Sequence, residues 1–307
     1  VSDGTVHGTS GNDFMDVGYG DTQNDTIDGD DGDDDIIEAG AGNDTVYAGA
    51  GNDLVDGGDG NDLIYGQGGD DTLNGDAGND TIYGNNGTDT IDGGIGNDII
   101  FGGGGTNDLT GGAGDDIFGM DVRSLGSNGG RQTHTILDFD ADDDQIDLSF
   151  LNISDFDTLI RFMDEDQDDL LITFTHDGST EQFILKDILF NDTTEDNFIL
   201  STDTTDLTVG ITGRNFTDYT LFGGLGNDTV TSGSGDDVLD GGAGDDELAA
   251  AAGANVIYGG AGNDDFNITQ RSNRFTDTTM EDFTIGEDQL DVSFLNVSTF
   301  EDLQQFL

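Results

Sequence analysis

The amino-acid sequence predicts an all-β protein: a parallel β-solenoid of nine-residue repeats in two tandem arrays, each followed by a β-rich cap. Residues 57–101 form five such repeats with no spacer, GGDGNDLIY, GQGGDDTLN, GDAGNDTIY, GNNGTDTID and GGIGNDIIF. Short fixed periods indicate stacked architectures in which each unit contacts its neighbours. The tandem arrangement is predicted because residues 279–307 match residues 135–163 without a gap, at a constant shift of 144.

The first array is expected to span residues 1–119. Each unit has a Gly-rich turn, Asp at its sixth position and an aliphatic residue at its eighth. Residues 1–28 are irregular and carry the pattern at Asp13 and Asp25. We assign Asp34 to the sixth position of a ten-residue unit. The units that follow hold at this position Asp44, Asp53, Asp62, Asp71, Asp80, Asp89, Asp98, Asn107 and Asp116.

Residues 120–205 are predicted to form a compact β-rich cap with its own core, because Gly becomes scarce and eight of the 19 Phe lie there. Residues 145–148 are typical of a strand. Apolar residues then follow at helical spacing, at Phe156, Leu159, Ile160 and Met163. Residues 170–200 alternate around a His-Asp-Gly turn, which predicts a β-hairpin.

A second, shorter array is expected at residues 206–267, and a truncated second cap at residues 268–307. This cap stops at Leu307, opposite Met163, and the chain begins at Val1, so we expect a fragment of a longer protein. Asn255 occupies the sixth position of a weak unit. The other sixth positions hold Asp228, Asp237, Asp246 and Asp264.

The spacing of these Asp residues indicates a divalent cation site. Two nine-residue units make one coil of 18, so each unit stacks on the next but one. Stacked strands lie about 4.8 Å apart, which brings successive carboxylates close enough to repel. Ca²⁺ takes roughly six to eight oxygen ligands at about 2.3–2.6 Å, whereas Mg²⁺ needs about 2.0–2.1 Å and keeps its water, so calcium fits better. One aliphatic side chain per unit cannot offset the entropy of ordering nine residues, so we expect the array to stay unfolded without the ion.

The same stacking rule sorts the sixth positions of the first array into two ladders. One holds Asp44, Asp62, Asp80, Asp98 and Asp116, and the other holds Asp34, Asp53, Asp71, Asp89 and Asn107. Counting the intervals with Asp at both ends predicts nine strong calcium sites, including two in the second array. Asn107 and Asn255 are expected to leave two weakened sites, because an amide oxygen can bind calcium but brings no charge.

The repeated GGxGxD pattern resembles the RTX, or haemolysin-type, calcium-binding nonapeptide repeat. The resemblance implies a β-roll in which each ion is bound by two Asp side chains, carbonyls 1 and 3 of one turn and carbonyls 2 and 4 of the turn next but one. Mapped onto this chain, one turn supplies the carbonyls of Gly57 and Asp59 with Asp62. Its partner supplies the carbonyls of Asp76 and Gly78 with Asp80. The turn residues that the resemblance places at the metal are Gly57, Gly58, Asp59, Gly60, Gly75, Asp76, Ala77, Gly78, Gly93, Gly94, Ile95 and Gly96.

Composition narrows the function classes. The chain has 67 acidic and seven basic side chains, a net charge of −60, and neither Cys nor Pro. Such a charge repels nucleic acid and anionic membranes. No apolar run approaches the ~20 residues of a membrane span, so we expect no nucleic-acid partner and no membrane insertion. The absence of Cys excludes disulfides and thiol metal sites.

The sequence contains no catalytic motif that we recognise. His7, His134 and His176 lie far apart and outside any H-E-x-x-H pattern, so they are interpreted as turn or surface residues. No G-x-S-x-G occurs. The acidic runs at residues 140–144 and 164–169 lack the Gly and Glu of an EF-hand loop and are interpreted as solvated turns. We therefore predict that this segment is not an enzyme.

These patterns predict a calcium-binding, non-catalytic module. The resemblance implies a secreted, extracellular bacterial protein that passes unfolded through a type I secretion machinery and folds in the calcium-rich exterior. Two alternatives stay open. One is the non-catalytic C-terminal part of a secreted protease, lipase or polysaccharide epimerase, and the other is a spacer in a surface adhesin.

Overall fold

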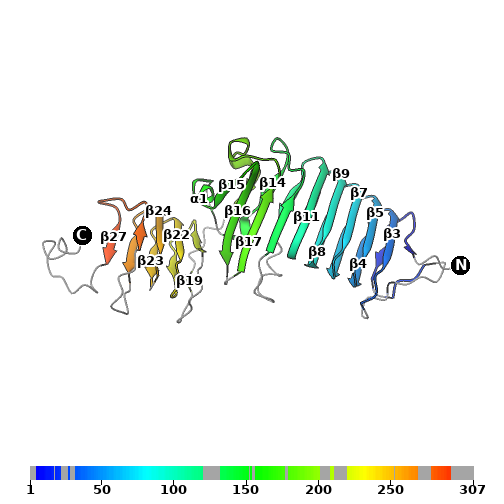
Figure 1. Cartoon of the computed structure of the whole chain (residues 1–307), viewed down its shortest axis with the longest axis horizontal. Coiled ribbons are helices and arrows are strands. Elements are labelled where there is room, and N and C mark those ends of the chain that lie inside the picture. Colours follow the sequence, from blue (N-terminus) through cyan, green and yellow to red (C-terminus); the bar gives the residue numbers. More distant parts are fainter. Residues whose placement is uncertain are drawn as a thin grey trace. The chain divides into compact units, whose positions relative to one another are not determined.

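The computed structural model describes residues 5–16, 18–21, 27, 32–119, 132–151, 153, 156–176, 179–200, 208–210, 220–251, 253–268 and 278–291. The chain divides into two compact units (Figure 1). Unit 1 comprises Val1–Leu148, Phe162–Thr173 and Ser179–Ile199, and unit 2 comprises Ser149–Arg161, Phe174–Gly178 and Leu200–Leu307. Both units are parallel β-solenoids, which confirms the prediction of an all-β, parallel solenoid fold. Within the described ranges, no helix is long and apolar enough to cross a membrane.

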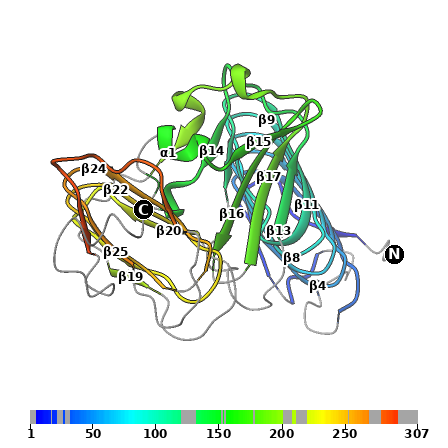
Figure 2. The same cartoon turned by 60° about the vertical axis from the view of Figure 1, so that its left-hand side comes forward.

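Unit 1 is built from two rows of parallel strands (Figures 1 and 2). The first row runs β1 (Val6–His7), β3 (Ile36–Ala41), β5 (Leu54–Asp59), β7 (Thr72–Ala77), β9 (Thr90–Ile95), β11 (Gly104–Ala113), β13 (Gln132–Ile136) and β17 (Ser179–Leu185). The second runs β2 (Phe14–Met15), β4 (Thr45–Ala50), β6 (Leu63–Gly68), β8 (Thr81–Gly87), β10 (Ile99–Phe101), β12 (Ile117–Gly119), β14 (Gln145–Asp147) and β18 (Phe198–Ile199). The rows are linked where β11 also pairs with β8. Within the repeats each strand pairs with the next but one, as the 18-residue coil predicts.

The strands are longer than the repeat predicts. Val55 pairs with Leu73, and the pairing continues past the turn glycine until Asp59 lies opposite Ala77. Strands β3 to β7 therefore hold six residues, from position 7 of one unit to position 3 of the next, and not only the three that follow the sixth-position residue. Gly57 itself drops out of the register. The chain bends at this glycine and then pairs again before the turn.

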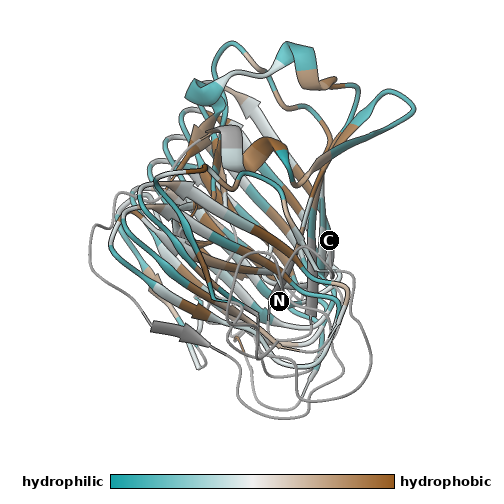
Figure 3. Ribbon diagram, turned by 90° about the vertical axis from the view of Figure 1, so that its left-hand side faces the viewer, coloured by the Kyte–Doolittle hydropathy of each residue, from teal (hydrophilic) through white to brown (hydrophobic). Residues whose placement is uncertain are grey.

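The interior of unit 1 is a stack of eighth-position side chains with no exposed surface. These are Ile37, Val46, Val55, Ile64, Leu73, Ile82, Ile91, Ile100, Leu109 and Phe118. In Figure 3 brown, apolar segments lie within the strands, and teal, polar segments follow them along the coils. Each side chain buries a modest apolar area, so the core grows by repetition along the solenoid.

Strands β13, β14, β17 and β18, between residues 132 and 199, continue this stack, although a separate cap core was expected. Ile136 pairs beside Leu109, and Leu185 beside Ile136. Ile146 pairs beside Phe118, and Phe198 beside Ile146, so the same two apolar rows run on. The expected strand at residues 145–148 is confirmed as β14. The predicted domain boundaries at residues 119, 205 and 267 remain predictions.

The helical spacing after residue 155 is confirmed for Phe156, Leu159 and Ile160, which lie in α1 (Phe156–Ile160), and is wrong for Met163, which lies in a strand. The chain then forms β15 (Met163–Asp166), which pairs antiparallel with β16 (Asp169–His176). The turn of the hairpin expected at residues 177–178 lies outside the described residues. Short 3₁₀ turns occupy Ser149–Leu151, Phe190–Asp192 and Glu195–Asn197.

One prediction about register is wrong. Ile36 pairs with Leu54 and Ile37 with Val55, so Ile37 is the buried eighth-position residue and Ile36 is 42% exposed. Asp35, not Asp34, therefore takes the sixth position, and all units from there on have nine residues. Three consecutive Asp and two consecutive Ile at residues 33–37 made the two registers equivalent in sequence.

An aromatic ladder follows the outer side of the second row. The rings of Tyr47, Tyr65, Tyr83 and Phe101 stack with centroid separations of 4.7, 4.9 and 4.8 Å and interplanar angles of 5°, 8° and 7°. Stacked aromatic pairs on neighbouring strands add to sheet stability. Because the ring faces cover one another, the ladder stabilises the strand register.

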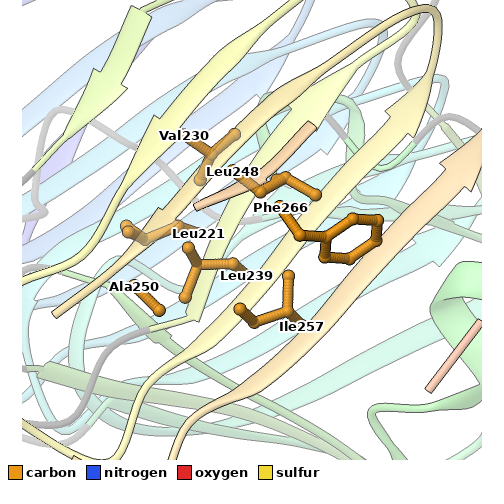
Figure 4. Packing of buried hydrophobic residues seen from close by; sticks show 7 residues of the cluster. All are labelled: Leu221, Val230, Leu239, Leu248, Ala250, Ile257 and Phe266. Atoms are coloured by element: carbon orange, nitrogen blue, oxygen red, sulfur yellow. The ribbon is translucent and has the colours of Figure 1, made fainter. Parts of the chain in front are cut away.

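Unit 2 repeats the architecture over fewer coils. One row runs β19 (Thr208–Gly210), β21 (Thr229–Thr231), β23 (Glu247–Ala250), β25 (Asp265–Ile268) and β27 (Gln289–Asp291). The other runs β20 (Thr220–Gly224), β22 (Val238–Ala243), β24 (Val256–Ala261) and β26 (Thr279–Met280). Figure 4 shows the interior cluster to which both rows contribute: Leu221, Val230, Leu239, Leu248, Ala250, Ile257 and Phe266.

Unit 2 also includes α1 and the residue that follows it. Arg161 Nη1 lies 2.5 Å from Asp240 Oδ2, and the guanidinium lies 3.9 Å above the ring of Tyr258. Asp240 is 1% exposed although it stands on the outer side of β22. Its charge is thus compensated by one of the chain's seven basic side chains.

Candidate metal centre

The sixth-position Asp side chains form continuous ladders along the turns. Each Oδ1 accepts the backbone N–H of the sixth residue one coil earlier, as in Asp62 N–H to Asp80 Oδ1 and Asp80 N–H to Asp98 Oδ1, both 2.7 Å. Nine intervals of 18 residues with Asp at both ends share this bond. Apart from the half-buried Asp35, the ladder Asp side chains at 18-residue spacing are no more than 3% exposed: Asp44, Asp53, Asp62, Asp71, Asp80, Asp89, Asp98, Asp116, Asp228, Asp237, Asp246 and Asp264.

The second carboxylate oxygen behaves differently from the first. Among the described residues, Oδ2 is buried and accepts no hydrogen bond in Asp44, Asp62, Asp71, Asp80, Asp89, Asp98, Asp116, Asp246 and Asp264. A buried charged oxygen without a partner is costly unless a cation or a proton compensates it. The ladders therefore present regularly spaced oxygens that need a positive charge.

Backbone carbonyls converge on the same oxygens. A Cβ placed on Gly75 would meet Asp80 Oδ2 at 2.5 Å and the Gly93 carbonyl oxygen at 2.5 Å. Gly66 and Gly84 repeat the arrangement with Asp71 and Asp89. The first glycine of each such turn is therefore required because the space above it is occupied by a carboxylate oxygen and a carbonyl oxygen.

The carbonyl directions correct the ligand set expected from the resemblance. The carbonyls of Asp76 and Gly78 lie against the following coil, at Gly94 and Gly96. The Asp59 carbonyl faces the preceding coil and accepts the Gly42 N–H at 2.7 Å. The carbonyl oxygens of Asp59 and Asp76 thus point away from each other and cannot bind the same ion.

The carbonyl oxygens that do face each other come from positions 2 and 4 of the earlier turn and positions 1 and 3 of the later one. Between the coils of Asp80 and Asp98, the Asp76 and Gly78 carbonyls point forward. The carbonyls of Gly93 and Ile95 point back, the latter accepting the Gly78 N–H at 2.8 Å. Positions 2 and 4 of the earlier turn therefore face positions 1 and 3 of the later one.

Burial raises the pKa of the ladder carboxyls. For Asp80 burial is the largest cause, the Asp98 and Asp62 carboxylates add to it, and the N–H bond from Asp62 opposes it, so that the pKa is about 7. With burial again the largest cause, the pKa is about 7 for Asp71 and Asp246, and about 6 for Asp89, Asp116 and Asp264.

These raised pKa values predict how protons and the cation compete. A carboxyl whose folded pKa exceeds its unfolded value contributes stability that is present in full below the unfolded pKa and is lost as pH rises through the folded pKa. In chelator we therefore expect more β structure at pH 4.5 than at pH 7.5. Cation binding should release protons at pH 4.5, where the folded chain keeps its ladder carboxyls protonated, and none at pH 7.5, where the unfolded chain is already ionised, as measured by calorimetry in buffers of different ionisation enthalpy. Binding to a folded chain at pH 4.5 without proton release would contradict the raised pKa values.

The ladder ends are closed by aspartates whose Oδ2 is already hydrogen-bonded. Asp116 N–H donates to Asp144 Oδ1, and Asp264 N–H donates to Asp288 Oδ1, at 2.9 and 3.0 Å. In Asp144 and Asp288, Oδ2 accepts a backbone N–H from four residues earlier. At the other end Asp13 Oδ2 accepts the Thr9 N–H in the same way. Asp25 lies outside the described residues.

Asp144 was interpreted as part of a solvated turn, and this is wrong, since it is 4% exposed and extends the ladder. The sequence did not indicate this role, because Asp144 follows Asp116 by 28 residues and not by the 18 of the regular ladder. A second contact near this ladder end was also missed: the two oxygens of Asp138 accept the N–H groups of Gly111 and Gly112, both at 2.9 Å. Asp282 does the same for Gly259 and Gly260. The 144-residue shift, which relates Asp138 to Asp282, was the sequence feature that could have indicated a shared role for these two residues.

Fifth-position side chains form an outer ladder that sequence reasoning also missed. Asn61 Oδ1 accepts the Asn79 N–H and Asn79 Oδ1 accepts the Asn97 N–H, at 3.0 and 3.1 Å. These bonds run in the opposite direction to those of the Asp ladder. Each Asn-Asp pair therefore ties its turn to the coil on either side.

The histidines do not form a site. His7 pairs with Glu38 at 3.1 Å, and the His176 side chain lies outside what the structure describes. His134, expected at the surface, has no exposed area in β13, and burial lowers its pKa to about 4. Among the described residues, no group of three or more His, Cys, Asp or Glu side chains could hold a metal. A cation in these turns must take backbone carbonyls as well, which suits Ca²⁺.

Comparison with known families agrees with this oxygen-rich geometry. The RTX calcium-binding nonapeptide repeat matches residues 7–37, 33–64, 47–82, 65–100, 83–118, 220–248 and 240–267, together more than half of the chain. The chain belongs to this family. Its RTX repeats thus form a calcium-binding β-roll, and the predicted family resemblance is confirmed. No curated protein sequence shows a significant match to the chain.

Solved structures similar to this RTX chain include two subunits of the Azotobacter vinelandii mannuronan C5-epimerase. AlgE6R3 is 23% identical over 45% of this chain and 77% of its own, with a TM-score of 0.21. AlgE6R2 is 22% identical over 47% of this chain and 95% of its own, with a TM-score of 0.22. A hyperactive, Ca²⁺-dependent, β-helical antifreeze protein from an Antarctic bacterium is 17% identical over 99% of this chain and 90% of its own, with a TM-score of 0.31.

Proposed function

We propose that this RTX chain is a calcium-dependent folding and stabilising module of a secreted bacterial protein, with no catalytic role of its own. The observation that carries the proposal is the row of buried Oδ2 atoms that accept no hydrogen bond, in residues such as Asp62, Asp80 and Asp98. At neutral pH these charges oppose folding until a cation neutralises them. Calcium then stabilises the fold by mass action, because it binds the folded chain and not the unfolded one.

The proposed ligands of one ion are two Asp carboxylates and four turn carbonyls. Between the coils of Asp80 and Asp98, the carbonyls are those that face each other there, from Asp76, Gly78, Gly93 and Ile95. These six oxygens match the lower end of the roughly six to eight oxygen ligands that calcium takes. We propose the same set at each of the nine 18-residue intervals bounded by two Asp residues, and hence about nine ions.

Circular dichroism tests the proposal directly. In chelator at pH 7.5 we expect a coil spectrum, and in millimolar calcium a β spectrum. Magnesium at the same concentration is the matched control and should leave the chain largely unfolded, because it gives up its water reluctantly. A β spectrum of equal intensity in chelator would contradict the proposal.

Export of the unfolded chain by a type I secretion machinery fits the same chemistry. A chain with a net charge of −60 and no Cys stays extended and free of crosslinks while calcium is scarce. Folding outside the cell would then depend on the calcium met there. Secretion from a host strain with and without the exporter, followed by immunoblotting of the medium, tests this step.

Two settings for the module are proposed as alternatives. It could be the non-catalytic part of a secreted protease, lipase or polysaccharide epimerase, or a calcium-stiffened spacer in a surface adhesin. The second is favoured by the contacts of Asp138 and Asp282, because the same hydrogen bonds from one Asp to two successive glycine N–H groups occur at the end of each array. The complete reading frame decides between them: a neighbouring catalytic domain supports the first and further repeats support the second.

A further inference from the structure

The last Asp of each array is joined to an Asp that lies outside the nine-residue period. In unit 1 the Asp116 N–H donates to Asp144 Oδ1 at 2.9 Å, and the Asp116 carbonyl accepts the Gln145 N–H at 2.8 Å. The 18-residue interval between Asp80 and Asp98 has the same pair of bonds. The interval from Asp116 to Asp144, which we call the terminal interval of unit 1, therefore has the backbone contacts of a regular interval although its spacing differs.

The carboxylate of Asp116 has one oxygen without a partner at this end of the ladder. Asp116 is 1% exposed, and its Oδ1 accepts the Asp98 N–H at 2.8 Å. Its Oδ2 is buried, accepts no hydrogen bond and lies against the first glycine of its own unit, Gly111, as Asp80 Oδ2 lies against Gly75. A buried charged oxygen is costly unless a cation or a proton compensates it. Asp116 therefore needs a positive charge in the terminal interval as well.

The turn that precedes Asp116 is expected to supply carbonyl oxygens to the same interval. Gly112 and Gly114 have φ values of 101° and 137°, and the corresponding Gly94 and Gly96 have 104° and 137°. The carbonyls of Gly94 and Gly96 lie against the following coil. Since the turn conformation is the same, the carbonyls of Gly112 and Gly114 point towards Asp144. Two carboxylates and two carbonyls leave part of the coordination of a calcium ion, which takes roughly six to eight oxygens, to water.

A third carboxylate adds negative charge to this interval. The two oxygens of Asp138 accept the N–H groups of Gly111 and Gly112. Burial is the largest cause of the raised pKa of Asp144, which is about 6, and the carboxylates of Asp116 and Asp138 raise it further. Because no described group of three acidic side chains could hold a metal by itself, Asp138 is a charge beside the ion and not one of its ligands.

Unit 2 has the same arrangement at the end of its own array, from Asp264 to Asp288. The Asp264 N–H donates to Asp288 Oδ1 at 3.0 Å, and Asp264 Oδ2 is buried and accepts no hydrogen bond. Asp282 accepts the N–H groups of Gly259 and Gly260. Burial, followed by the carboxylates of Asp288 and Asp282, raises the pKa of Asp264 to about 6. The unpartnered oxygen thus occurs at the same place in two separate units.

The opposite end of the first ladder shows what an interval without this need is like. The Asp13 N–H donates to Asp44 Oδ1 at 2.6 Å, so the backbone contact is present there too. Asp13 Oδ2, however, accepts the backbone N–H of Thr9 at 2.6 Å and its hydroxyl at 2.8 Å. The carboxylate that begins this interval is therefore compensated by hydrogen bonds and does not require an ion.

We infer that each array ends in a further calcium site, between Asp116 and Asp144 in unit 1 and between Asp264 and Asp288 in unit 2. The inference rests on the proposed calcium-dependent folding and adds one ion per array to the nine proposed above. Each ion joins the last repeat to the strand that follows it, which begins directly after Asp144 as β14 and directly after Asp288 as β27.

Alanine variants test the inference by calcium stoichiometry, measured by calorimetry on the full chain at pH 7.5. Asp144→Ala and Asp288→Ala should each bind one calcium ion fewer than the wild type. Asp13→Ala is the matched control, because Asp13 also ends a ladder and its Oδ2 also accepts an N–H from four residues earlier. We expect this control to keep the wild-type number of ions.

A third variant guards against loss of folding. Asp144→Ala also leaves the Asp116 N–H without its acceptor, whereas Asp144→Asn keeps an oxygen there and removes only the charge. If neither Ala variant folds in calcium, Asp144→Asn decides, and one of its ions should bind at least tenfold more weakly than in the wild type.

The outcomes separate this inference from the proposed function. Folded Asp144→Ala and Asp288→Ala chains with the wild-type number of ions would overturn the inference, as would wild-type affinity at every site of Asp144→Asn. The loss of an ion in Asp13→Ala would overturn it too, because hydrogen-bonded and unpartnered carboxylates would then not differ. A wild type that binds no calcium would instead refute the calcium-dependent folding itself.

Discussion

Asp80→Ala is expected to remove two calcium ions and to raise the calcium concentration needed for folding. Asp80 bounds two intervals of its ladder, with Asp62 on one side and Asp98 on the other. At free calcium about 100 times the dissociation constant, each ion contributes about 2.7 kcal/mol, so two contribute about 5 kcal/mol. The substitution also leaves the buried Asp62 N–H without its acceptor, which costs about 1–3 kcal/mol more. Calcium titrations followed by circular dichroism and calorimetry measure both effects.

The effect should stay on one ladder. Asp71 and Asp89 accept N–H groups from their own ladder and none from Asp80. Asp59→Ala is the matched control, because it removes an exposed carboxylate from the preceding turn and leaves the ladder bonds in place. We expect it to keep the wild-type stoichiometry. A loss of all ions in Asp80→Ala, or an equal loss in the control, would contradict a ladder model.

The ladders could be predicted from sequence because the nine-residue period fixes both the row and the coil of each residue. Asp62, Asp80 and Asp98 are separated by 18 residues, and parallel pairing at that shift leaves no freedom in where their side chains lie. The same logic placed the apolar stack. It failed at Asp34, where runs of identical residues at 33–37 allowed two registers and only the pairing of Ile37 with Val55 distinguishes them.

The ends of the ladders could not be predicted, because their contacts depend on loops of irregular length. Asp144 follows Asp116 by 28 residues and His134 follows Asn107 by 27, so no period relates them. The direction of the turn carbonyls also could not be predicted from the sequence. It depends on the alternation of backbone orientation along positions 1–4, which the pattern of side chains does not encode. The reversed ligand set between Asp80 and Asp98 is a consequence of that alternation.

Gly75→Ala is expected to destabilise the array strongly, although it adds only one methyl group. Neither Gly75 nor the control Gly68 has a positive φ, so backbone strain does not distinguish them. A Cβ on Gly75 would lie 2.5 Å from both Asp80 Oδ2 and the Gly93 carbonyl oxygen, whereas a Cβ on Gly68 would meet nothing within 4 Å. Overpacking costs about 1–3 kcal/mol, and the loss of one ion adds about 2.7 kcal/mol under the conditions above.

The two Ala variants therefore measure two different effects. Gly75→Ala reports whether this glycine leaves room for the oxygens, and Gly68→Ala reports the general effect of glycine on the entropy of the unfolded chain. Replacing Gly by Ala at a compatible position stabilises a protein by about 0.4–1 kcal/mol through the unfolded state, so Gly68→Ala should need slightly less calcium than the wild type. Gly75→Ala should need more and should bind one ion fewer, as measured by calorimetry. Equal calcium midpoints for the two variants would show that the space above Gly75 is not where an ion's ligands converge. The first glycine of the repeat would then be required by its turn alone.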